Sequence, residues 1–383
     1  MTHSLHPHAR RSRGRARAGV ALVMAVVAMA ILGALVTGVF FTALREQRDG
    51  RDAVHRVQAL GAAEYGVAAA LSPSSWRRGW NVTRRRGQIS VASHAPDAGT
   101  SYSVALWKLN GDDFLLVSSG AAGSAPPLAS RRVALLVTLR IPVIATRAAI
   151  TAMNGVYVQD SSLVMGVDNV PDGWECPPPD VTRPAVIVPA ASLFADTACT
   201  TALCVIGAPA VASDTIAASA DTYQSFGSVQ RDSIASTALQ LATDAALTEP
   251  APSLDGMGEC DASRANNLGD PLRVLGASSP CADYLPVLHA PGNMRIDGGA
   301  GQGLLLVDGD LTIAGGARFS GVAAVRGVLE ITEASELRGA ILASRVIVRD
   351  GSHARYSSCA VERALRAAAE PVVPEGLAWS ELY

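Results

Sequence analysis

The feature that most constrains this chain is an uncharged apolar run near its start. From Ala18 to Leu44 the sequence holds 27 residues without a charge, and about 20 suffice for a helix to cross a bilayer. Five arginines lie between residues 10 and 17, with no acidic residue among them. Because basic residues stay on the cytoplasmic side, we expect a cytoplasmic N-terminus and an exported chain beyond residue 45.

The alternative to a retained anchor is a cleaved secretory signal. The apolar run is longer than the core of a signal peptide, and no A-x-A cleavage site closes it. The helical pattern also continues without a proline until Pro73. We therefore predict one helix over residues 20–72, roughly 75 Å long at 1.5 Å per residue. Its first half would lie in lipid, and its second half would project outward.

The order of segments around this helix resembles a known family. A basic leader, residues 1–19, ends in Gly19, and an apolar stretch VALVMAVVAMAIL and a polar helix ending QALGAAEYGVAAAL follow it. This order resembles the N-terminal segment of PilX-type minor pilins, which are type IV pilus assembly proteins. The resemblance implies that a prepilin peptidase cuts after Gly19 and leaves Val20 as the new N-terminus. It also aligns AAEYG, which contains Glu64, with the family's AAEAG signature at the end of the assembly helix.

One position departs from the pilin pattern. Major pilins carry Glu at the fifth mature position, where its charge can pair with the N-terminal amine of a neighbouring subunit. Here the fifth residue from Val20 is Met24. Some minor pilins and the K-type minor pseudopilin of type II secretion also lack this Glu. The departure argues against a place along a filament shaft and leaves a tip, priming or accessory role open.

Composition and periodicity indicate that the rest of the chain is mainly β. Hydrophobic residues make up 49% of the sequence and charged residues 17%, which argues against disorder. Between Gln88 and Arg140 the apolar positions alternate, as in half-buried strands, and Asn110-Gly111 is a strong hairpin signal. We predict three strands in a small antiparallel sheet over residues 73–144. In pilins such a sheet packs on the long N-terminal helix.

A glycine repeat dominates the C-terminal part. Gly303, Gly321 and Gly339 each begin a similar apolar strand and lie 18 residues apart. Short strands with a fixed glycine period predict a parallel β-solenoid. We place it at residues 145–358, with Leu311, Leu329 and Ile347 stacked in its core.

Three further segments belong to this region. Residues 154–166 have the look of an outlying rung of the solenoid. Residues 170–285 read as an irregular, cysteine-containing insertion, within which 228–247 has helical composition. Residues 359–383 read as a cap and tail, because a helix from Cys359 would cover an open end of the stack.

Six cysteines lie beyond the apolar run, at Cys176, Cys199, Cys204, Cys260, Cys281 and Cys359. An even number on the exported side of a membrane anchor allows up to three disulfides, for which fifteen pairings exist. The pairing is not readable from the spacing. No CxxC pair or neighbouring histidine pair predicts a zinc site.

The sequence predicts no catalytic, cofactor-binding or metal-binding residue. It contains no nucleophile elbow, phosphate-binding loop or HExxH motif. Asp308 and Asp310 flank Gly309, and we interpret them as turn residues rather than as catalytic acids. The formal net charge of −2 gives no footprint for nucleic acid.

The expected function is therefore a structural minor pilin-like subunit of a type IV pilus or a related pseudopilus, and not an enzyme. Its expected partners are other pilin subunits, a prepilin peptidase and inner-membrane lipid. The expected location is a bacterial inner membrane, with a single span and an exported head that could enter a surface pilus. The alternatives are a permanently anchored solenoid scaffold that binds envelope polymer and, with less support, a solenoid carbohydrate enzyme.

Overall fold

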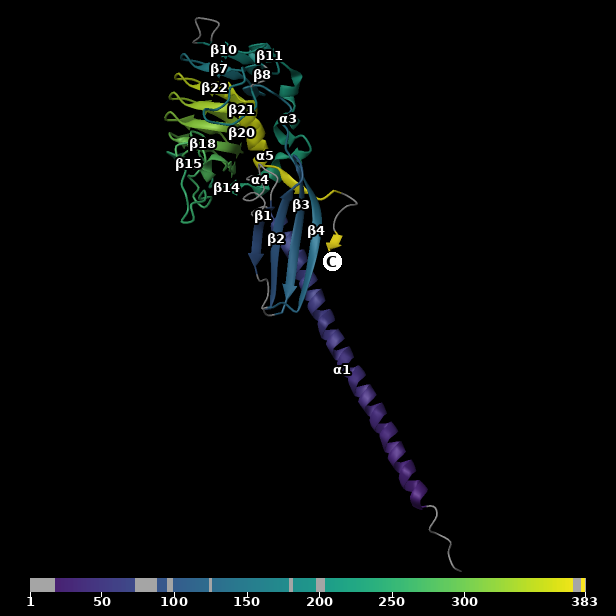
Figure 1. The fold of residues 1–383 in the computed structure, drawn as a ribbon. Helices are drawn as coiled ribbons and strands as arrows, with labels where there is room; N and C mark the ends of the chain where they lie inside the picture. The colour runs from purple at the N-terminus through teal and green to yellow at the C-terminus, as the bar shows by residue number, and fades with distance from the viewer. Residues whose placement is uncertain are drawn as a thin grey trace, which may run out of the picture.

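The computed structural model describes residues 18–72, 88–94, 99–123, 126–178, 182–197, 204–374 and 380–382. Most of the basic leader, residues 1–17, and the connection at 73–87 lie outside these ranges. Figure 1 shows a long helix that carries an antiparallel sheet and, beyond the sheet, a stack of parallel strands.

The predicted N-terminal helix is confirmed. Helix α1 runs from Ala18 to Leu71, 54 residues, which is about 81 Å at 1.5 Å per residue. It contains an 18-residue window of mean hydropathy 2.7, none of which is buried. By length and composition α1 is able to cross a membrane.

The second half of α1 packs on the sheet through small residues. Ala59, Ala63 and Gly66 are buried on one side of the helix. A Cβ on Gly66 would collide with the hydroxyl of Ser118 and lie 2.9 Å from the ring of Tyr102. The small residues of the AAEYG segment are therefore required by the close approach of helix and sheet.

The antiparallel sheet has the strand order β1-β2-β3-β4-β23, and β24 also pairs with β4. The Asn110-Gly111 hairpin is confirmed, because β2 and β3 pair up to Lys108 opposite Phe114. A strand ahead of the three predicted ones, β1, extends the sheet. Its strands are β1 (Gln88–His94), β2 (Thr100–Lys108), β3 (Asp113–Ala122), β4 (Ala129–Arg140), β23 (Glu370–Val372) and β24 (Ser380–Leu382).

The solenoid is inserted into this sheet domain. The chain leaves the sheet after β4, builds the stack, and returns through helix α5 (Ser358–Ala367) to β23. Strand β23 then pairs antiparallel with β4, with Glu370 opposite Arg140. The final residues are thus partly a component of the antiparallel sheet, which differs from the expected cap and tail.

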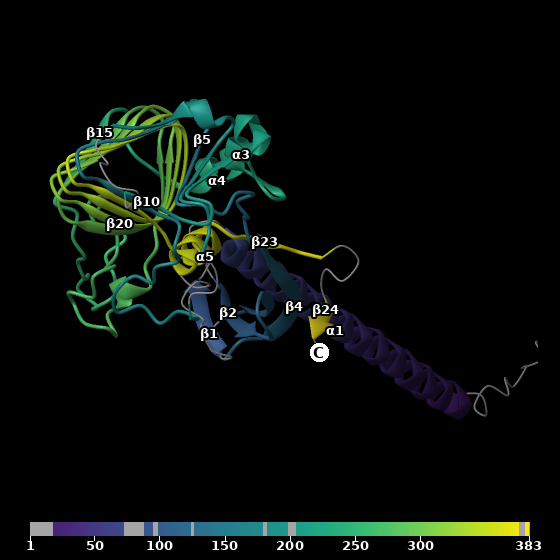
Figure 2. The ribbon, with the colours of Figure 1, turned by 90° about the horizontal axis from the view of Figure 1, so that it is seen from above.

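The parallel β-solenoid is confirmed, and Figure 2 looks along its stack. Its strands are β5 (Ile150–Ala152), β6 (Val156–Val158), β7 (Leu163–Met165), β8 (Val186–Val188), β9 (Phe194–Asp196), β10 (Val205–Ile206), β11 (Val211–Ser213), β14 (Leu239–Gln240), β15 (Ala245–Thr248), β16 (Val287–Ala290), β17 (Met294–Asp297), β18 (Ala300–Val307), β19 (Leu311–Ala314), β20 (Arg318–Ile331), β21 (Glu336–Val348) and β22 (His353–Tyr356). Their inward side chains form one continuous apolar core.

The 18-residue glycine period is the register of the stack. Gly303 pairs with Gly321, and Gly321 pairs with Gly339. The predicted core position Ile347 is wrong, because Leu329 pairs with Val346. The pairing shifts between Val325 and Val328, so β21 reaches the core one residue earlier. Val346 is fully buried, and Ile347 is only half-buried.

The rungs are not stacked in chain order. The chain enters the stack at β5 and β6, which pair with β21, and at β7, which pairs with β22. It then builds β8 to β11 outward on these strands. It next crosses to the far end, starts again at β14, and winds back to β22. The outlying rung predicted at 154–166 is therefore an internal rung, joined on both sides.

Two expected segments differ from the structure. The segment 170–285 is not wholly irregular, because it contains rung strands β8–β11, β14 and β15. The helical pattern over 228–247 is helical only in α4 (Arg231–Thr237), since β14 and β15 follow it. Pairing with the next rung overrides the helix propensity of that stretch.

The remaining short elements lie on the crossing segment and beside the stack. Helix α5 packs against β18, β20 and β21 in the middle of the stack rather than over an end. The other elements are η1 (Ala191–Leu193), η2 (Thr215–Ala218), α3 (Asp221–Gln224), η3 (Pro280–Ala282) and the β12 (Ser225–Phe226) and β13 (Val229–Gln230) pair.

Candidate functional site

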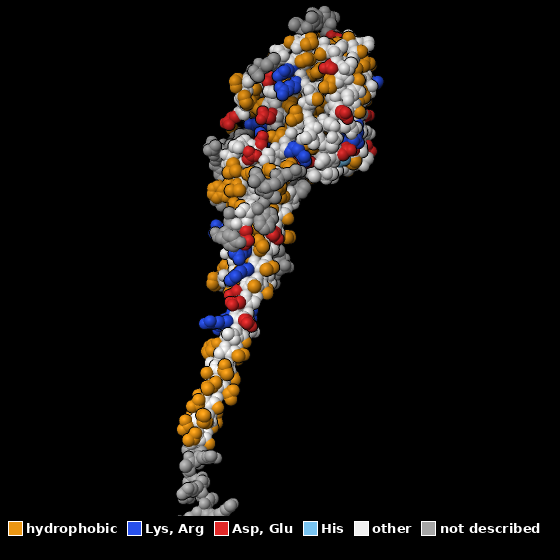
Figure 3. Space-filling model, turned by 90° about the vertical axis from the view of Figure 1, so that its right-hand side faces the viewer, with side chains coloured by type: hydrophobic (Ala, Val, Ile, Leu, Met, Phe, Trp, Pro, Cys, Tyr) orange, Lys and Arg blue, Asp and Glu red, His pale blue; other side chains and the backbone are white. Residues whose placement is uncertain are grey.

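In the described part of the chain, the apolar half of α1 is uncovered. Val20 is 64% exposed and Met24 is 67% exposed, and the other large side chains of this half are similarly open. Figure 3 shows hydrophobic side chains along this end of the helix, with charged ones only nearer the head. An apolar surface of this size requires lipid or other apolar helices as its surroundings.

The predicted leader and assembly residues fall on different parts of α1. Gly19 is the second residue of the helix, and Met24 lies five residues further on. Glu64 is exposed in the half that packs on the sheet. About 60 Å of helix separates Met24 from Glu64 at 1.5 Å per residue, so the structure does not bring them together.

Ion pairs fix the solenoid to the sheet domain. The Glu370 carboxylate lies 3.0 Å from the Arg140 guanidinium of β4 and accepts a hydrogen bond of 2.7 Å from Ser233 of α4. The Arg366 guanidinium of α5 lies 2.6 Å from Asp112 in the β2–β3 turn. Helix α5 and strand β23 therefore hold both parts at the point where the chain passes between them.

The Cys176–Cys359 disulfide joins the segment after β7 to helix α5, across 183 residues of sequence. Beside it, the Asp168 carboxylate accepts hydrogen bonds of 2.9 Å from the Ser358 amide and 2.5 Å from its hydroxyl. The amide of Asn169 also donates to the carbonyl of Tyr356. These links hold the segment after β7 against the end of β22 and the start of α5. They therefore join an early and a late part of the solenoid sequence.

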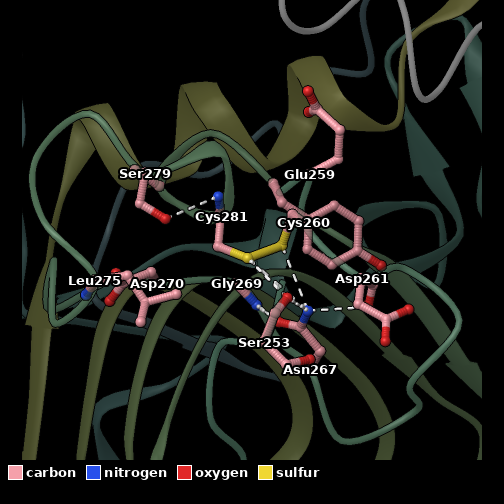
Figure 4. The surroundings of a disulfide bond; sticks show 12 residues. Ser253, Glu259, Cys260, Asp261, Asn267, Gly269, Asp270, Leu275, Ser279 and Cys281 are labelled. Atoms are coloured by element: carbon pink, nitrogen blue, oxygen red, sulfur yellow. Dashed lines mark hydrogen bonds between the residues drawn. A yellow bond between two sulfur atoms is a disulfide. The ribbon is translucent and has the colours of Figure 1, made fainter. Parts of the chain in front are cut away.

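A second disulfide, Cys260–Cys281, closes the loop between β15 and β16 (Figure 4). Beside it the side-chain amide of Asn267 donates to the carbonyls of Ser253 and Asp261 at 3.0 and 2.9 Å. Cys204 is also disulfide-bonded, and Cys199 lies outside the described residues. The pairing depends on contacts that sequence spacing does not encode.

A buried polar cluster lies between α4 and the middle rungs. Arg231 is 1% exposed, and its guanidinium lies 2.7 Å from the Asp308 carboxylate. The other oxygen of Asp308 lies 2.9 Å from Nε2 of His289. Arg326 reaches the same carboxylate at 3.2 Å. The sequence indicated a turn residue at Asp308 and gave no signal for its partners, which lie on other rungs and on α4.

This cluster has the geometry of a structural anchor. The Asp308 carboxylate is bound by two guanidinium groups and an imidazole, and the Nδ1 atom of His289 is engaged by Gln240. Asp310 is likewise occupied, because its carboxylate accepts a hydrogen bond of 2.7 Å from the Val328 amide of the next rung. These groups tie α4 and neighbouring rungs together.

The cluster predicts a loss of stability in acid. Burial alone would raise the pKa of Asp308, but hydrogen bonds from His289 and Arg231 outweigh it and lower the pKa below the ordinary value of 3.8. A lowered carboxyl pKa stabilises the fold above pH 3.8, and this contribution is lost as the pH falls through the folded-state pKa. We expect the difference in denaturant midpoint between the wild type and Asp308→Asn to shrink between about pH 5 and pH 2. Unfolding curves followed by circular dichroism measure it, and a constant difference would contradict the assignment.

A cavity of about 330 Å³ lies between α5, the sheet and the loops at 175–177 and 283–285. Its wall combines Phe114 and Leu139 with the charged side chains of Lys108, Glu362 and Arg366. Burial and the nearby Arg366 lower the pKa of Lys108, while Asp112 opposes them. Acidic and basic groups both line the wall, so the cavity favours no single ligand charge.

No metal-binding arrangement is evident in the described part of the chain. Among those residues, no three or more His, Cys, Asp or Glu side chains lie where they could hold a metal ion. The enzyme alternative required carboxylates clustered in one groove, whereas the Asp308 cluster is dominated by cations.

The fold consists of a long N-terminal apolar helix, an antiparallel sheet that packs on it, and a parallel β-solenoid inserted in the sheet domain. No family model matches the chain, and no curated protein matches it. Among solved structures it is similar to the competence-associated pilin ComZ from Thermus thermophilus, with 12% identity over 86% of this chain and 97% of that chain. The TM-score is 0.25, so the two structures superpose poorly over their full length.

Proposed function

We propose that this protein is a pilin-like subunit, of the PilX type or a close variant, that enters a type IV pilus or a related pseudopilus and displays a β-solenoid head. The observation that carries the proposal is the division of α1 into two halves. One half is apolar and uncovered, and the other packs on an antiparallel sheet through Ala59, Ala63 and Gly66. Apolar helices of neighbouring subunits or inner-membrane lipid would cover the first half.

The position of the solenoid favours display at the exposed end of a filament. In Figure 1 the stack lies beyond the end of α1 that carries the sheet, on the side away from the apolar half. Met24 supplies no carboxylate at the fifth position from Val20. Both features fit a subunit with no neighbour above it better than one enclosed within a shaft.

A second candidate is a permanently anchored scaffold that binds envelope polymer. The observation in its favour is the same missing carboxylate, because a chain without it has less reason to pack against a neighbour's N-terminal amine. The two candidates differ at the leader. A pilin-like subunit is cut by the prepilin peptidase, and a permanent anchor keeps residues 1–19.

The first test is the mass of the mature N-terminus. We expect membrane-extracted protein to begin at Val20 when the prepilin peptidase is present and at Met1 when it is absent. Mass spectrometry of the N-terminal peptide measures both forms. As a control, Gly19→Leu is expected to leave the leader attached without changing the β-head. An intact Met1 in both strains would reject the pilin pathway and leave the anchored scaffold.

A further inference from the structure

The loop between β15 and β16 carries a concentration of exposed apolar side chains. Eleven large hydrophobic residues outside α1 are exposed in the described part of the chain, and five of them lie between residues 254 and 275. Met257 is 86% exposed and Val274 is 65% exposed. Single exposed apolar residues are ordinary on a protein surface, but a local concentration marks an interaction site. The five are Leu254, Met257, Leu272, Val274 and Leu275.

Hydrogen bonds hold the first tip of this loop. Leu254 and Cys260 form an antiparallel bridge, so the segment between them turns back on itself. One carboxylate oxygen of Asp255 accepts hydrogen bonds from the amides of Met257 at 2.8 Å and Glu259 at 3.0 Å. Met257 therefore lies at the end of a tight turn whose backbone is held by the Asp255 carboxylate.

The second tip is held by a buried carboxylate. Asp270 is fully buried, and its two oxygens accept hydrogen bonds from the amides of Val274 at 2.8 Å and Leu275 at 2.9 Å. The Arg273 guanidinium donates to the carbonyl of Ala282 at 2.5 Å. The Cys260–Cys281 disulfide joins the two tips at their bases, with Asp270 close to it in Figure 4.

This arrangement fixes the backbone while leaving the apolar side chains in water. A loop that is already ordered loses little conformational entropy when it binds, so rigid tips favour association. The loop therefore has the construction of a docking surface rather than of a simple connection.

The place of the loop indicates its partner. Figure 1 shows it hanging from the β15 end of the stack, toward the level of the antiparallel sheet. From Leu44 to Leu71 the helix rises about 40 Å at 1.5 Å per residue, so the loop lies well above a bilayer that contains the apolar half. A neighbouring subunit anchored in the same way would bring its own head to this level.

We propose that residues 254–275 dock onto the head of a neighbouring pilin-like subunit in the same assembly, an inference that rests on the proposed function. Asp255 and Glu259 flank Met257, so the complementary surface is an apolar patch with basic side chains at its edge. The contact would set the solenoid on the assembly below it, while the apolar halves of the helices pack together.

The test uses the full-length chain in the cell that makes it. A photo-reactive benzophenone amino acid is placed at position 257 and, in a separate variant, at position 36 in the apolar half of α1. We expect both positions to crosslink to another pilin-like subunit, identified by mass spectrometry. Crosslinking from position 36 alone would overturn the docking surface and leave the proposed function intact. Failure at both positions would overturn both, and crosslinking of position 257 only to lipid or to an unrelated protein would overturn the docking surface.

A matched pair of variants measures the contribution of the tips. Met257→Ser combined with Val274→Ser is expected to lower the recovery of the co-purified subunit about tenfold, because exposed apolar side chains at an interface supply much of its affinity. Both residues are exposed, so the fold is retained. Ile216→Ser, an exposed apolar change in η2 after the opposite end of the stack, is expected to leave recovery unchanged. Equal recovery for all three proteins would overturn the docking surface.

Discussion

Gly339→Ala is expected to unfold the middle of the solenoid. Gly339 has φ = +145°, and a Cβ there would fall on the carbonyl oxygen of Gly321, 2.7 Å from its carbonyl carbon. The clash is with the backbone of a neighbouring rung, which no rotamer change relieves. Because parallel rungs lie about 4.8 Å apart, the stack must separate locally to accept one methyl group.

The expected cost is more than about 4 kcal/mol, in the range reserved for severe core or backbone defects. It is measured from the chemical denaturation of detergent-extracted full-length protein, followed by circular dichroism. Gly316→Ala is the matched control. Gly316 has φ = +72° with no atom within 4 Å of the added Cβ, so only the left-handed strain of about 1–2 kcal/mol applies. Equal effects of the two changes would show that the glycine column does not set the rung contact.

Asp308→Asn is expected to be the most damaging change among the polar residues. It removes the negative charge 2.7 Å from Arg231, whose side chain is 2% exposed, and leaves that guanidinium buried with only the exposed Asp232, at 3.8 Å, as a counter-charge. Breaking a buried ion pair from one side costs about 3–5 kcal/mol, because the remaining charge stays desolvated. The same denaturation experiment measures the loss.

Asp232→Asn is the control for this prediction. Asp232 contacts the same two arginines, at 3.8 Å from Arg231 and 2.8 Å from Arg326, but its side chain is 74% exposed. A surface ion pair contributes at most about 1 kcal/mol, so this variant is expected to unfold close to the wild type. If both variants lose the same stability, burial of Arg231 is not the cause.

Local patterns in the sequence correctly predicted the long apolar helix, the hairpin and the repeating stack. The uncharged run of 27 residues can be recognised in the sequence, because a membrane-spanning helix needs apolar residues over a fixed length. The Asn110-Gly111 turn can be recognised because few residues tolerate its backbone angles. The glycine period can be recognised because each rung makes the same close backbone contact with the rung before it. In all three cases one physical requirement acts on neighbouring or evenly spaced residues.

The failures came where residues distant in sequence meet. The core phase at Ile347 was wrong because one turn of the stack is a residue shorter, and its register is set by pairing with Leu329. The cluster around Asp308 could not be predicted, since Arg231 and His289 are brought to it by the crossing segment and by a different rung. No pattern among residues close in sequence indicates which rungs are neighbours in the stack.

The sequence by itself determined the long apolar helix, the antiparallel hairpin and the existence of a repeating parallel stack. Only the tertiary structure decided that the solenoid is inserted in the sheet domain, that its first and last rungs meet in the middle, and that Cys176 pairs with Cys359. The physical reason is that helix and strand patterns follow from contacts between residues close in sequence. The order of rungs depends instead on contacts across as many as 190 residues, which the chain makes only once it is folded.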